Sequence, residues 1–347
     1  MEIFDLLVLG GGPGGYLCAE RAAQGGKKVV LFEKRALGGT CLNEGCIPTK
    51  TFLNSSKMYR HATESQVFGV TAQGVSYDHV KVVDRKNKVV KTLVSGVEST
   101  MAANGIQVVK ASGVITGKSR EGFSVEAGGK RYMGTHLVIA SGSETFVPPV
   151  PGLREGLQSG FVVTNREILE EKNLPKELVV IGGGVIGLEM AYYFASVGTH
   201  VTVIEMMPKI AGATDPEICK VLMDSFKKRK MDIELSARVL EVKSDSVIYE
   251  KDGQKKEISC DQVLLSAGRK PATAGIGLEV LGIHMERGAI VTDRHMCTNV
   301  SRVYAIGDCN GRSMLAHTAY REAEVAVNHM LGIPDYMRYE VIPSGSV

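Results

Sequence analysis

The hydrophobic and polar positions near the start of the chain change from a strand pattern to a helix pattern and back. Residues 3–9 form a short apolar run, which predicts a buried strand. Residues 16–24 then predict a helix, and residues 28–32 predict a second strand. The order of strand, helix and strand is typical of a βαβ motif with parallel strands.

The same order returns in the second half of the chain. Residues 177–181 and 200–204 predict two further strands, and residues 188–197 predict the helix between them. A separate amphipathic stretch, residues 80–101, predicts a long helix whose lysine-rich face is solvated. The pattern therefore predicts an α/β protein with two βαβ motifs.

Each predicted motif carries glycines at the spacing G-x-G-x-x-G between its first strand and its helix. In such a turn the first glycine makes the bend, the second admits a diphosphate, and the third lets helix and strand pack closely. The start of the helix then directs unpaired amides at the phosphates. The glycines are Gly10, Gly12 and Gly15 in the first motif, and Gly182, Gly184 and Gly187 in the second. Two complete motifs predict two bound dinucleotides.

An acidic residue follows the second strand of each motif. Glu33 and Glu205 each stand 23 positions after the first glycine, where a carboxylate accepts hydrogen bonds from a ribose. A carboxylate at this place pairs with a free 2′-hydroxyl and repels a 2′-phosphate, for which an arginine would be expected. In the sequence, Lys209 is the first basic residue after Glu205. The second motif is therefore predicted to bind NAD rather than NADP.

Two cysteines, Cys41 and Cys46, lie close together in the run from Gly38 to Lys50, just after the first motif. A chain from a reducing compartment rarely carries a structural disulfide, so a close pair there indicates metal binding or redox chemistry. Metal binding would need further ligands at short spacing, and neither a second cysteine pair nor a histidine cluster stands nearby in the sequence. The sequence therefore favours a redox thiol pair beside a bound electron carrier and predicts no metal site.

Composition and charge narrow the class of protein further. The 347 residues suffice for two or three domains, and 44% hydrophobic with 23% charged residues is typical of a globular protein. A net charge of +3 indicates no particular preference for nucleic acid or an acidic membrane. The sequence shows no leader pattern and no apolar run near the ~20 residues of a membrane span. Because most of the seven cysteines are scattered, we expect a reduced, cytoplasmic protein.

Together, the two glycine motifs and the cysteine run resemble the pyridine nucleotide-disulfide oxidoreductases, most closely those that act as dihydrolipoyl dehydrogenases. The resemblance covers essentially the whole chain, and the cysteine run is its most specific element. It implies two Rossmann-like domains of three-layer ββα type, with the NAD domain inserted in the FAD domain. The expected FAD domain consists of residues 1–144 and 274–347, and the expected NAD domain of residues 145–273.

The resemblance also implies further cofactor-binding residues. Residues 140–143 and 268–271 are similar to the links that leave the FAD and NAD domains. Residues 304–308 are similar to the second FAD fingerprint, and residues 314–319 to the start of a helix whose amides face the flavin. Besides the glycine motifs and their acidic residues, the implied set is Lys34, Gly39, Thr40, Lys50, Gly113, Gly142, Ser143, Asp308 and Ala316 for FAD, and Val239 and Gly268 for NAD.

The catalytic residues that the resemblance implies are Cys41, Cys46, Lys50 and Glu189. Cys41 would attack the substrate disulfide, and Cys46 would be the thiol nearest the flavin. Both cysteines are expected near the first turns of a helix that follows them. Lys50 would reach the flavin and pair with Glu189 in the NAD-binding part. The implied reaction passes electrons from dihydrolipoamide, or a lipoyl-bearing protein, through the cysteine disulfide and FAD to NAD.

The chain departs from the family pattern at its end, residues 342–347. Relatives continue there into a domain that forms a homodimer interface and gives a His–Glu pair to the partner's active site. We therefore expect this C-terminal dimerisation domain to be missing, the chain to be part of a longer homodimeric protein, and full lipoamide turnover to be doubtful.

Several alternatives belong to neighbouring classes. Glutathione and mercuric reductases share the cysteine run but prefer NADPH, which Glu205 disfavours. Small thioredoxin reductases carry a C-x-x-C pair in the NADPH domain, whereas four residues separate the two cysteines here. A flavoprotein that binds nucleotides without full turnover stays open as an interpretation.

Overall fold

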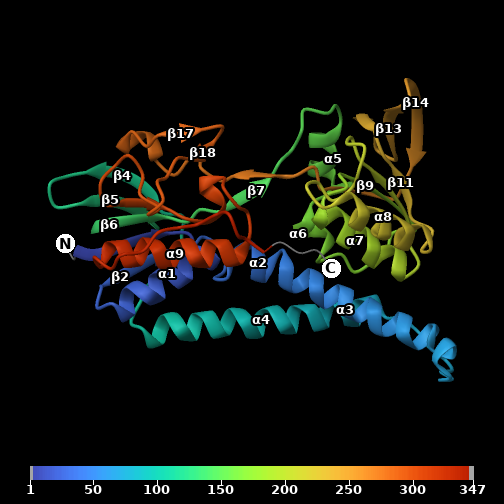
Figure 1. The fold of residues 1–347 in the computed structure, drawn as a ribbon, viewed down its shortest axis with the longest axis horizontal. Coiled ribbons are helices and arrows are strands. Elements are labelled where there is room, and N and C mark those ends of the chain that lie inside the picture. The colour runs from blue at the N-terminus through green and yellow to red at the C-terminus, as the bar shows by residue number, and fades with distance from the viewer. Residues whose placement is uncertain (1–2, 344–347) are drawn as a thin grey trace. The chain divides into compact units, whose positions relative to one another are not determined.

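The computed structural model describes residues 3–343 and divides into two compact units. Of the described residues, unit 1 contains 3–43, 90–144 and 269–343, and unit 2 contains 44–89 and 145–268. Figure 1 shows the elements of both units as a ribbon. Each unit is a Rossmann-like α/β structure, so the predicted fold class is confirmed.

Unit 1 is built on a sheet with the strand order β3-β2-β1-β6-β5-β4, and β19 pairs with β6 as a branch. The sheet contains parallel and antiparallel pairs. The parallel pairs are β3-β2, β2-β1, β1-β6 and β6-β19, and the antiparallel pairs are β6-β5 and β5-β4. The strands are β1 Ile3–Leu9, β2 Val29–Phe32, β3 Gln107–Val109, β4 Val114–Lys118, β5 Phe123–Ala127, β6 Lys130–Ile139 and β19 Val303–Ala305. Helices α1 (Pro13–Gln24) and α9 (Ala316–Met330) lie side by side in this unit (Figure 1).

Unit 2 contains a fully parallel sheet with the strand order β11-β10-β9-β15-β8 and a separate antiparallel sheet, β12-β13-β14. The parallel strands are β8 Val162–Val163, β9 Glu177–Ile181, β10 His200–Ile204, β11 Asp232–Glu234 and β15 Gln262–Leu265. The antiparallel strands are β12 Arg238–Val242, β13 Ser246–Lys251 and β14 Gln254–Ser259. The helices are α3 Cys46–Thr63, α5 Leu153–Ser159, α6 Asn165–Ile168, α7 Val185–Ser196 and α8 Pro216–Lys227.

The remaining elements are short, apart from one long helix. Helix α4, His79–Ala103, continues across the border between Val89 and Val90 and confirms the predicted long helix. Its lysines are exposed as predicted except Lys86, which is buried and pairs with Glu170. The short elements are α2 Gly39–Asn43, η1 Ser65–Phe68, β7 Ser143–Thr145, β16 Arg269–Pro271, η2 Leu278–Leu281, β17 Met285–Glu286, β18 Ala289–Ile290 and η3 Gly307–Asn310.

The βαβ motifs agree with the sequence predictions to within one residue, except at the starts of their helices. Strands β9 and β10 have the predicted bounds, but α1 and α7 each begin three residues before the predicted start. The last part of each glycine loop is already the first helical turn, with Pro13 at the start of α1, where a missing N–H costs nothing. The third glycine of each motif is therefore a helical residue.

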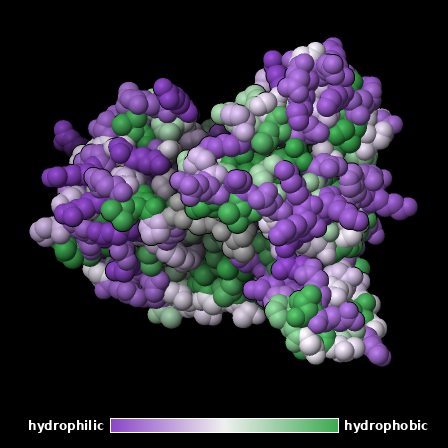
Figure 2. Space-filling view, turned by 45° about the vertical axis from the view of Figure 1, so that its right-hand side comes forward, coloured by the Kyte–Doolittle hydropathy of each residue, from purple (hydrophilic) through white to green (hydrophobic). Residues whose placement is uncertain are grey.

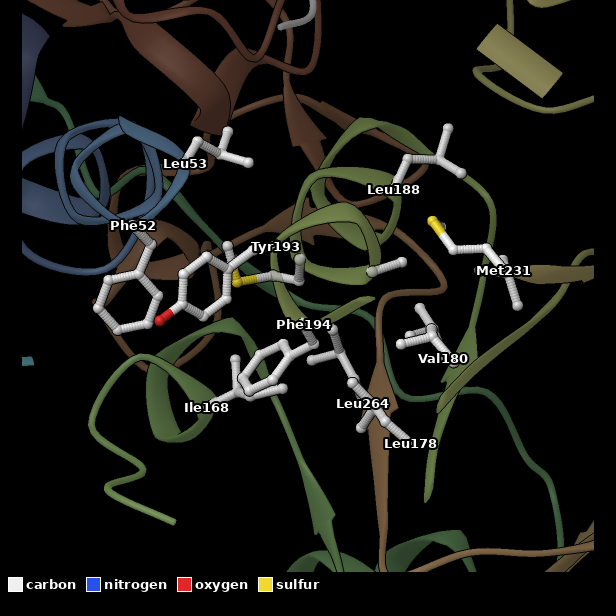
Figure 3. Packing of buried hydrophobic residues seen from close by; sticks show 14 of the residues in the cluster. Phe52, Leu53, Ile168, Leu178, Val180, Leu188, Tyr193, Phe194, Met231 and Leu264 are labelled. Carbon is white, nitrogen blue, oxygen red and sulfur yellow. The ribbon is translucent and has the colours of Figure 1, made fainter. Parts of the chain in front are cut away.

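The core of unit 2 explains why Glu44–Val89 packs with it. Phe52 of α3 is fully buried and stacks on Tyr193 of α7, with 4.6 Å between ring centroids and 26° between ring planes. Figure 3 shows the two rings next to each other, with Ile168 and Phe194 in the same cluster. Stacked aromatic pairs stabilise a core beyond the area that they bury.

The surface carries both polar and apolar side chains. On the face drawn in Figure 2, hydrophilic residues alternate with smaller hydrophobic groups. Among the helices within residues 3–343, none combines the length and the apolar character that a membrane crossing requires.

The stacked pair leads to a test of the core. We expect Phe52→Ala to lower the free energy of unfolding by about 3–5 kcal/mol, because a fully buried ring is lost and a cavity remains. The matched control is Phe68→Ala, since Phe68 is 81% exposed and its loss should change stability by less than about 0.5 kcal/mol. Urea unfolding followed by circular dichroism measures both; equal effects would contradict this account of the core.

Candidate functional site

The first glycine loop joins β1 to α1 in unit 1 and brings backbone into contact with backbone. Gly10 has φ +108°, and a Cβ there would lie 2.2 Å from the Ala140 carbonyl oxygen. A Cβ on Gly15 would lie 1.9 Å from the Gly10 carbonyl oxygen. Real Cβ atoms do not approach so closely, so both positions require glycine for the packing of the motif itself.

The second glycine loop joins β9 to α7 in unit 2 and repeats this geometry. Gly182 also has φ +108°, and a Cβ there would lie 2.3 Å from the Ser266 carbonyl oxygen. A Cβ on Gly187 would lie 2.3 Å from the Gly182 carbonyl oxygen. The two motifs therefore share the same internal reason for their first and third glycines.

The packing of the motifs does not require glycine at the middle positions, Gly12 and Gly184. Their φ values are −74° and −76°, with extended ψ, a conformation open to any residue. A Cβ on Gly184 would meet nothing within 4 Å, and one on Gly12 would have only the Gly39 Cα, at 3.8 Å. The missing side chain leaves open space at the start of a helix, which is where a diphosphate binds in such motifs.

The predicted acidic residues hold the two loops in the same way. In unit 1, Glu33 Oε2 accepts a hydrogen bond of 2.8 Å from the Gly11 amide, and Oε1 accepts one from the Arg35 amide. In unit 2, Glu205 Oε2 accepts a hydrogen bond of 2.6 Å from the Gly183 amide, and Oε1 accepts one from the Met207 amide. A carboxylate has about four acceptor sites, so each retains capacity for ribose hydroxyl groups. Lys34, next to Glu33, is exposed.

The turn before Cys41 packs directly on the first glycine loop. The Gly38 amide donates to the Gly11 carbonyl oxygen at 2.8 Å. Gly39 has φ +59°, and a Cβ there would lie 2.6 Å from the Gly12 Cα. Glycine at position 39 thus keeps the turn close to the open middle glycine. Cys41 follows in α2 of unit 1 and is partly buried.

Cys46 belongs to unit 2, where it is the first residue of α3 and is exposed. Only Cys46 therefore lies in the first turn of this helix, while Cys41 lies in the separate short helix α2, because Gly45 intervenes as the N-cap of α3. The residue before Gly45 is anchored within unit 2. Asn165 donates to the Glu44 carbonyl oxygen at 2.7 Å, and Arg166 pairs with the Glu44 carboxylate at 2.9 Å.

Lys50 and Glu189 form the ion pair that the resemblance implies. Lys50 Nζ lies 2.5 Å from Glu189 Oε1. The Glu189 side chain is only 6% exposed, while that of Lys50 is 42% exposed. Lys50 stands one turn after Cys46 in α3, and Glu189 stands in α7 just after the second glycine loop. The pair thus joins the helix that starts at Cys46 to the helix that starts at a nucleotide-binding loop, within one compact unit.

A polar cluster in unit 1 gathers several residues assigned to FAD. Ser143 donates a hydrogen bond to the carboxylate of Asp308, and Arg269 Nε donates to Ser143 Oγ at 2.8 Å. The Arg269 guanidinium also reaches Thr40 Oγ1, at 3.5 Å. Arg269 was not predicted as a site residue, although it lies in residues 268–271, which are similar to the exit from the NAD domain.

The other assigned positions lie at strand and helix ends. A Cβ on Gly113 would lie 2.7 Å from Leu9, so its glycine serves packing at the end of β1. Gly142 and Gly268 have φ values of +72° and +119°, which favour glycine. Ala316 opens α9, which has no side-chain cap. Val239 lies in β12, where the register with β13 shifts.

Four of the five remaining thiols are poorly suited to nucleophilic chemistry. Burial raises the pKa of Cys18, Cys260 and Cys309 to about 12, and that of Cys297 to about 11. Because the thiolate is the reactive form, these four are almost entirely inert thiols near neutral pH. Among residues 3–343, no group of His, Cys, Asp and Glu side chains is arranged to hold a metal ion.

The sequence of this chain is similar to those of dihydrolipoyl dehydrogenases from several organisms. A dihydrolipoyl dehydrogenase of Acholeplasma laidlawii is 44% identical over 331 residues, which cover 95% of this chain and 97% of the relative. One of Chlorobaculum parvum is 37% identical, over 98% of this chain and 73% of the relative.

Solved structures agree in fold. LpdA from Mycobacterium tuberculosis matches with a TM-score of 0.87 at 25% identity, over 96% of this chain and 74% of that chain. The HOCl-induced flavoprotein disulfide reductase RclA from Escherichia coli matches with a TM-score of 0.82 at 28% identity, over 94% of this chain and 71% of that chain. The family model described as pyridine nucleotide-disulphide oxidoreductase matches residues 4–323, and the chain therefore belongs to that family.

Proposed function

We propose that this chain is a flavin-dependent dihydrolipoyl dehydrogenase that transfers electrons from a dihydrolipoyl group to NAD. Curated relatives of that name, 34–44% identical over most of the chain, support the substrate class. The substrate is free dihydrolipoamide or a lipoyl-bearing protein. The homodimer and the cytoplasmic location expected from the sequence belong to the same proposal.

The Lys50–Glu189 ion pair is the observation that carries this proposal. It connects a redox-active type of cysteine run to a nucleotide-binding loop through two packed helices of unit 2. Burial of Glu189 makes an unpaired carboxylate costly, so the pair resists separation more than a surface pair would. The pair places a positive charge one turn after Cys46, and the same helix pair leads from Cys46 to the second glycine loop.

The two loops take different cofactors in this proposal. Unit 2, with Glu205 facing the ribose, would bind NAD, and unit 1 would bind FAD through the loop at Gly12, Glu33 and the Ser143–Asp308 cluster. The open space at Gly12 and the acceptor capacity of Glu33 fit a dinucleotide. When bound, FAD would supply a redox centre that links the two-electron chemistry of the thiols to hydride transfer with the nicotinamide. Residues 1–144 and 274–347 form the proposed FAD domain, and residues 145–273 form the proposed NAD domain. The compact units differ from this division at residues 44–89, which pack in unit 2, and at residues 269–273, which belong to unit 1.

The cysteines have distinct tasks in this scheme. A thiol of the substrate attacks the Cys41–Cys46 disulfide at Cys41 and releases Cys46 as a thiolate. The second substrate thiol then displaces Cys41, so the substrate leaves as a disulfide and both cysteines are left reduced. The first turn of α3 supplies unpaired amides, which stabilise negative charge on a thiolate at Cys46. Lys50, one turn further, adds a positive charge that Glu189 holds in place.

A substrate comparison tests the function. With FAD bound, we expect NAD reduction by dihydrolipoamide and much slower reduction by glutathione or reduced thioredoxin. Cys46→Ser should lower the dihydrolipoamide rate at least about a hundredfold, because the disulfide cannot form. Cys297→Ser is the matched control, since Cys297 is a partly buried thiol outside the scheme. A higher rate with glutathione or thioredoxin would favour another disulfide reductase, and binding of both cofactors without any turnover would favour a binding flavoprotein.

The middle glycine of unit 2 gives a test of the NAD site. We expect Gly184→Ala to keep the thermal stability of the protein but to weaken NADH binding about tenfold or more, because the added methyl group occupies open space meant for the diphosphate. Gly187→Ala should instead lower stability, since its Cβ would lie 2.3 Å from a backbone oxygen. Calorimetric titration with NADH and thermal unfolding separate the two. Unchanged NADH affinity in Gly184→Ala would remove this loop from the NAD site.

Glu205 gives a test of nucleotide preference. We expect Glu205→Gln to raise the affinity for NADPH relative to NADH by roughly tenfold, because the repulsion of the 2′-phosphate is lost. The amide oxygen can still accept from the Gly183 amide, which holds the glycine loop, whereas the hydrogen bond from the Met207 amide is lost. Glu33→Gln, the equivalent change in unit 1, is the matched control and should leave the ratio unchanged. A constant ratio in both variants would show that Glu205 does not select NAD.

A further inference from the structure

Glu322, in the middle of α9, is a carboxylate without exposed surface. Its Oε2 accepts hydrogen bonds from the Gly307 amide at 2.6 Å and from Asn310 Nδ2 at 2.9 Å, and its Oε1 accepts one from Tyr339 Oη at 2.6 Å. Burial raises the pKa of this carboxyl group, and the three hydrogen bonds act against that rise. A group so costly to bury needs all its partners.

Two of these partners lie in the same short element, η3. Gly307 opens it with φ +71°, and Asn310 closes it, so Glu322 grips both ends of a four-residue turn. Asp308 is the residue between them whose carboxylate accepts a hydrogen bond from Ser143. The turn that carries Asp308 is thus held at both of its ends by Glu322, while Cys309, inside the turn, also donates to the Ile139 carbonyl oxygen of β6.

We propose that Glu322 is a positioning residue for FAD, which holds η3 so that Asp308 presents its carboxylate to the hydroxyl groups of the cofactor's sugar-like chain. This inference rests on the proposed function, because it takes FAD as the ligand of unit 1. Glu322 itself touches no cofactor atom and acts through Asp308. Glu322 acts by its position, because its two carboxylate oxygens accept hydrogen bonds from three donors and so hold the two ends of η3 and Tyr339.

Two conservative variants separate geometry from charge. Glu322→Gln removes the charge but retains the reach, since its amide oxygen can accept from Gly307 and Asn310 while its NH2 group donates to the Tyr339 oxygen. Glu322→Asp retains the charge but is one methylene shorter, so it cannot reach both ends of η3. A positioning function predicts that Gln binds FAD better than Asp, and a charge function predicts the reverse order.

The experiment measures FAD affinity of the apoprotein by the change in flavin fluorescence on titration. We expect Glu322→Asp to bind FAD roughly tenfold more weakly than the wild type and Glu322→Gln to remain within about threefold. In an Asp308→Ala background, Glu322→Asp should cause no further loss, because residues that act through one another are not additive. Glu324→Asp is the matched control, a carboxylate on the same helix that pairs with Arg21 at the surface.

Each contrary outcome has a distinct meaning. Wild-type affinity in Glu322→Asp, weaker binding in Glu322→Gln than in Glu322→Asp, or full additivity with Asp308→Ala would overturn the inference. A wild-type protein that does not bind FAD would instead overturn the proposed function. If Glu322→Asp does not fold, Asn310→Ala removes one of the two contacts to η3, and unchanged FAD affinity in that variant would overturn the inference.

Discussion

The close approach of backbone to backbone in the two glycine loops is the constraint on which the rest of this structure depends. In each loop the third glycine lets the helix start within contact distance of the first glycine's carbonyl oxygen, with less than 2.5 Å available to any Cβ. Only this approach sets the helix start against the strand end, and only then do its amides converge on one point. The acidic residue follows from the same geometry, because it binds the amide between the first two glycines in both units.

The parts of the fold that depend on local sequence could be predicted. Strands β9 and β10 follow from short apolar runs, and α4 follows from a long amphipathic pattern. Such patterns can be recognised locally, because the buried face of a strand or helix needs apolar residues at a fixed spacing. The helix starts were predicted three residues late, because a glycine-rich stretch was taken as loop although its last turn is helical. The separation of Cys41 into a helix of its own was also missed, because the turn at Gly45 leaves little local signal.

The parts of the candidate site that depend on contacts across the sequence could not be predicted from composition or spacing. The pair of Lys50 and Glu189 joins residues 139 positions apart and entered only through a family resemblance. Arg269 and Glu322 had no such support. Each is a charged residue whose function is visible only from its partners, Ser143 and Thr40 for Arg269 and the turn at Gly307 for Glu322. Sequence patterns record which face of an element is buried, but they do not record which distant donor a buried carboxylate will meet.

The near identity of the two loops has a consequence for specificity. Their first glycines share φ +108°, their middle glycines share an open position, and their acidic residues make equivalent hydrogen bonds. A difference in cofactor therefore cannot arise inside the loops and must come from the residues around them. Unit 1 places Arg269, Ser143 and Asp308 in one polar cluster, whereas unit 2 follows Glu205 with two exposed methionines, Met206 and Met207. Under the proposed function, the repeated motif would supply two equivalent diphosphate sites, and the surrounding polar and apolar side chains would divide them between FAD and NAD.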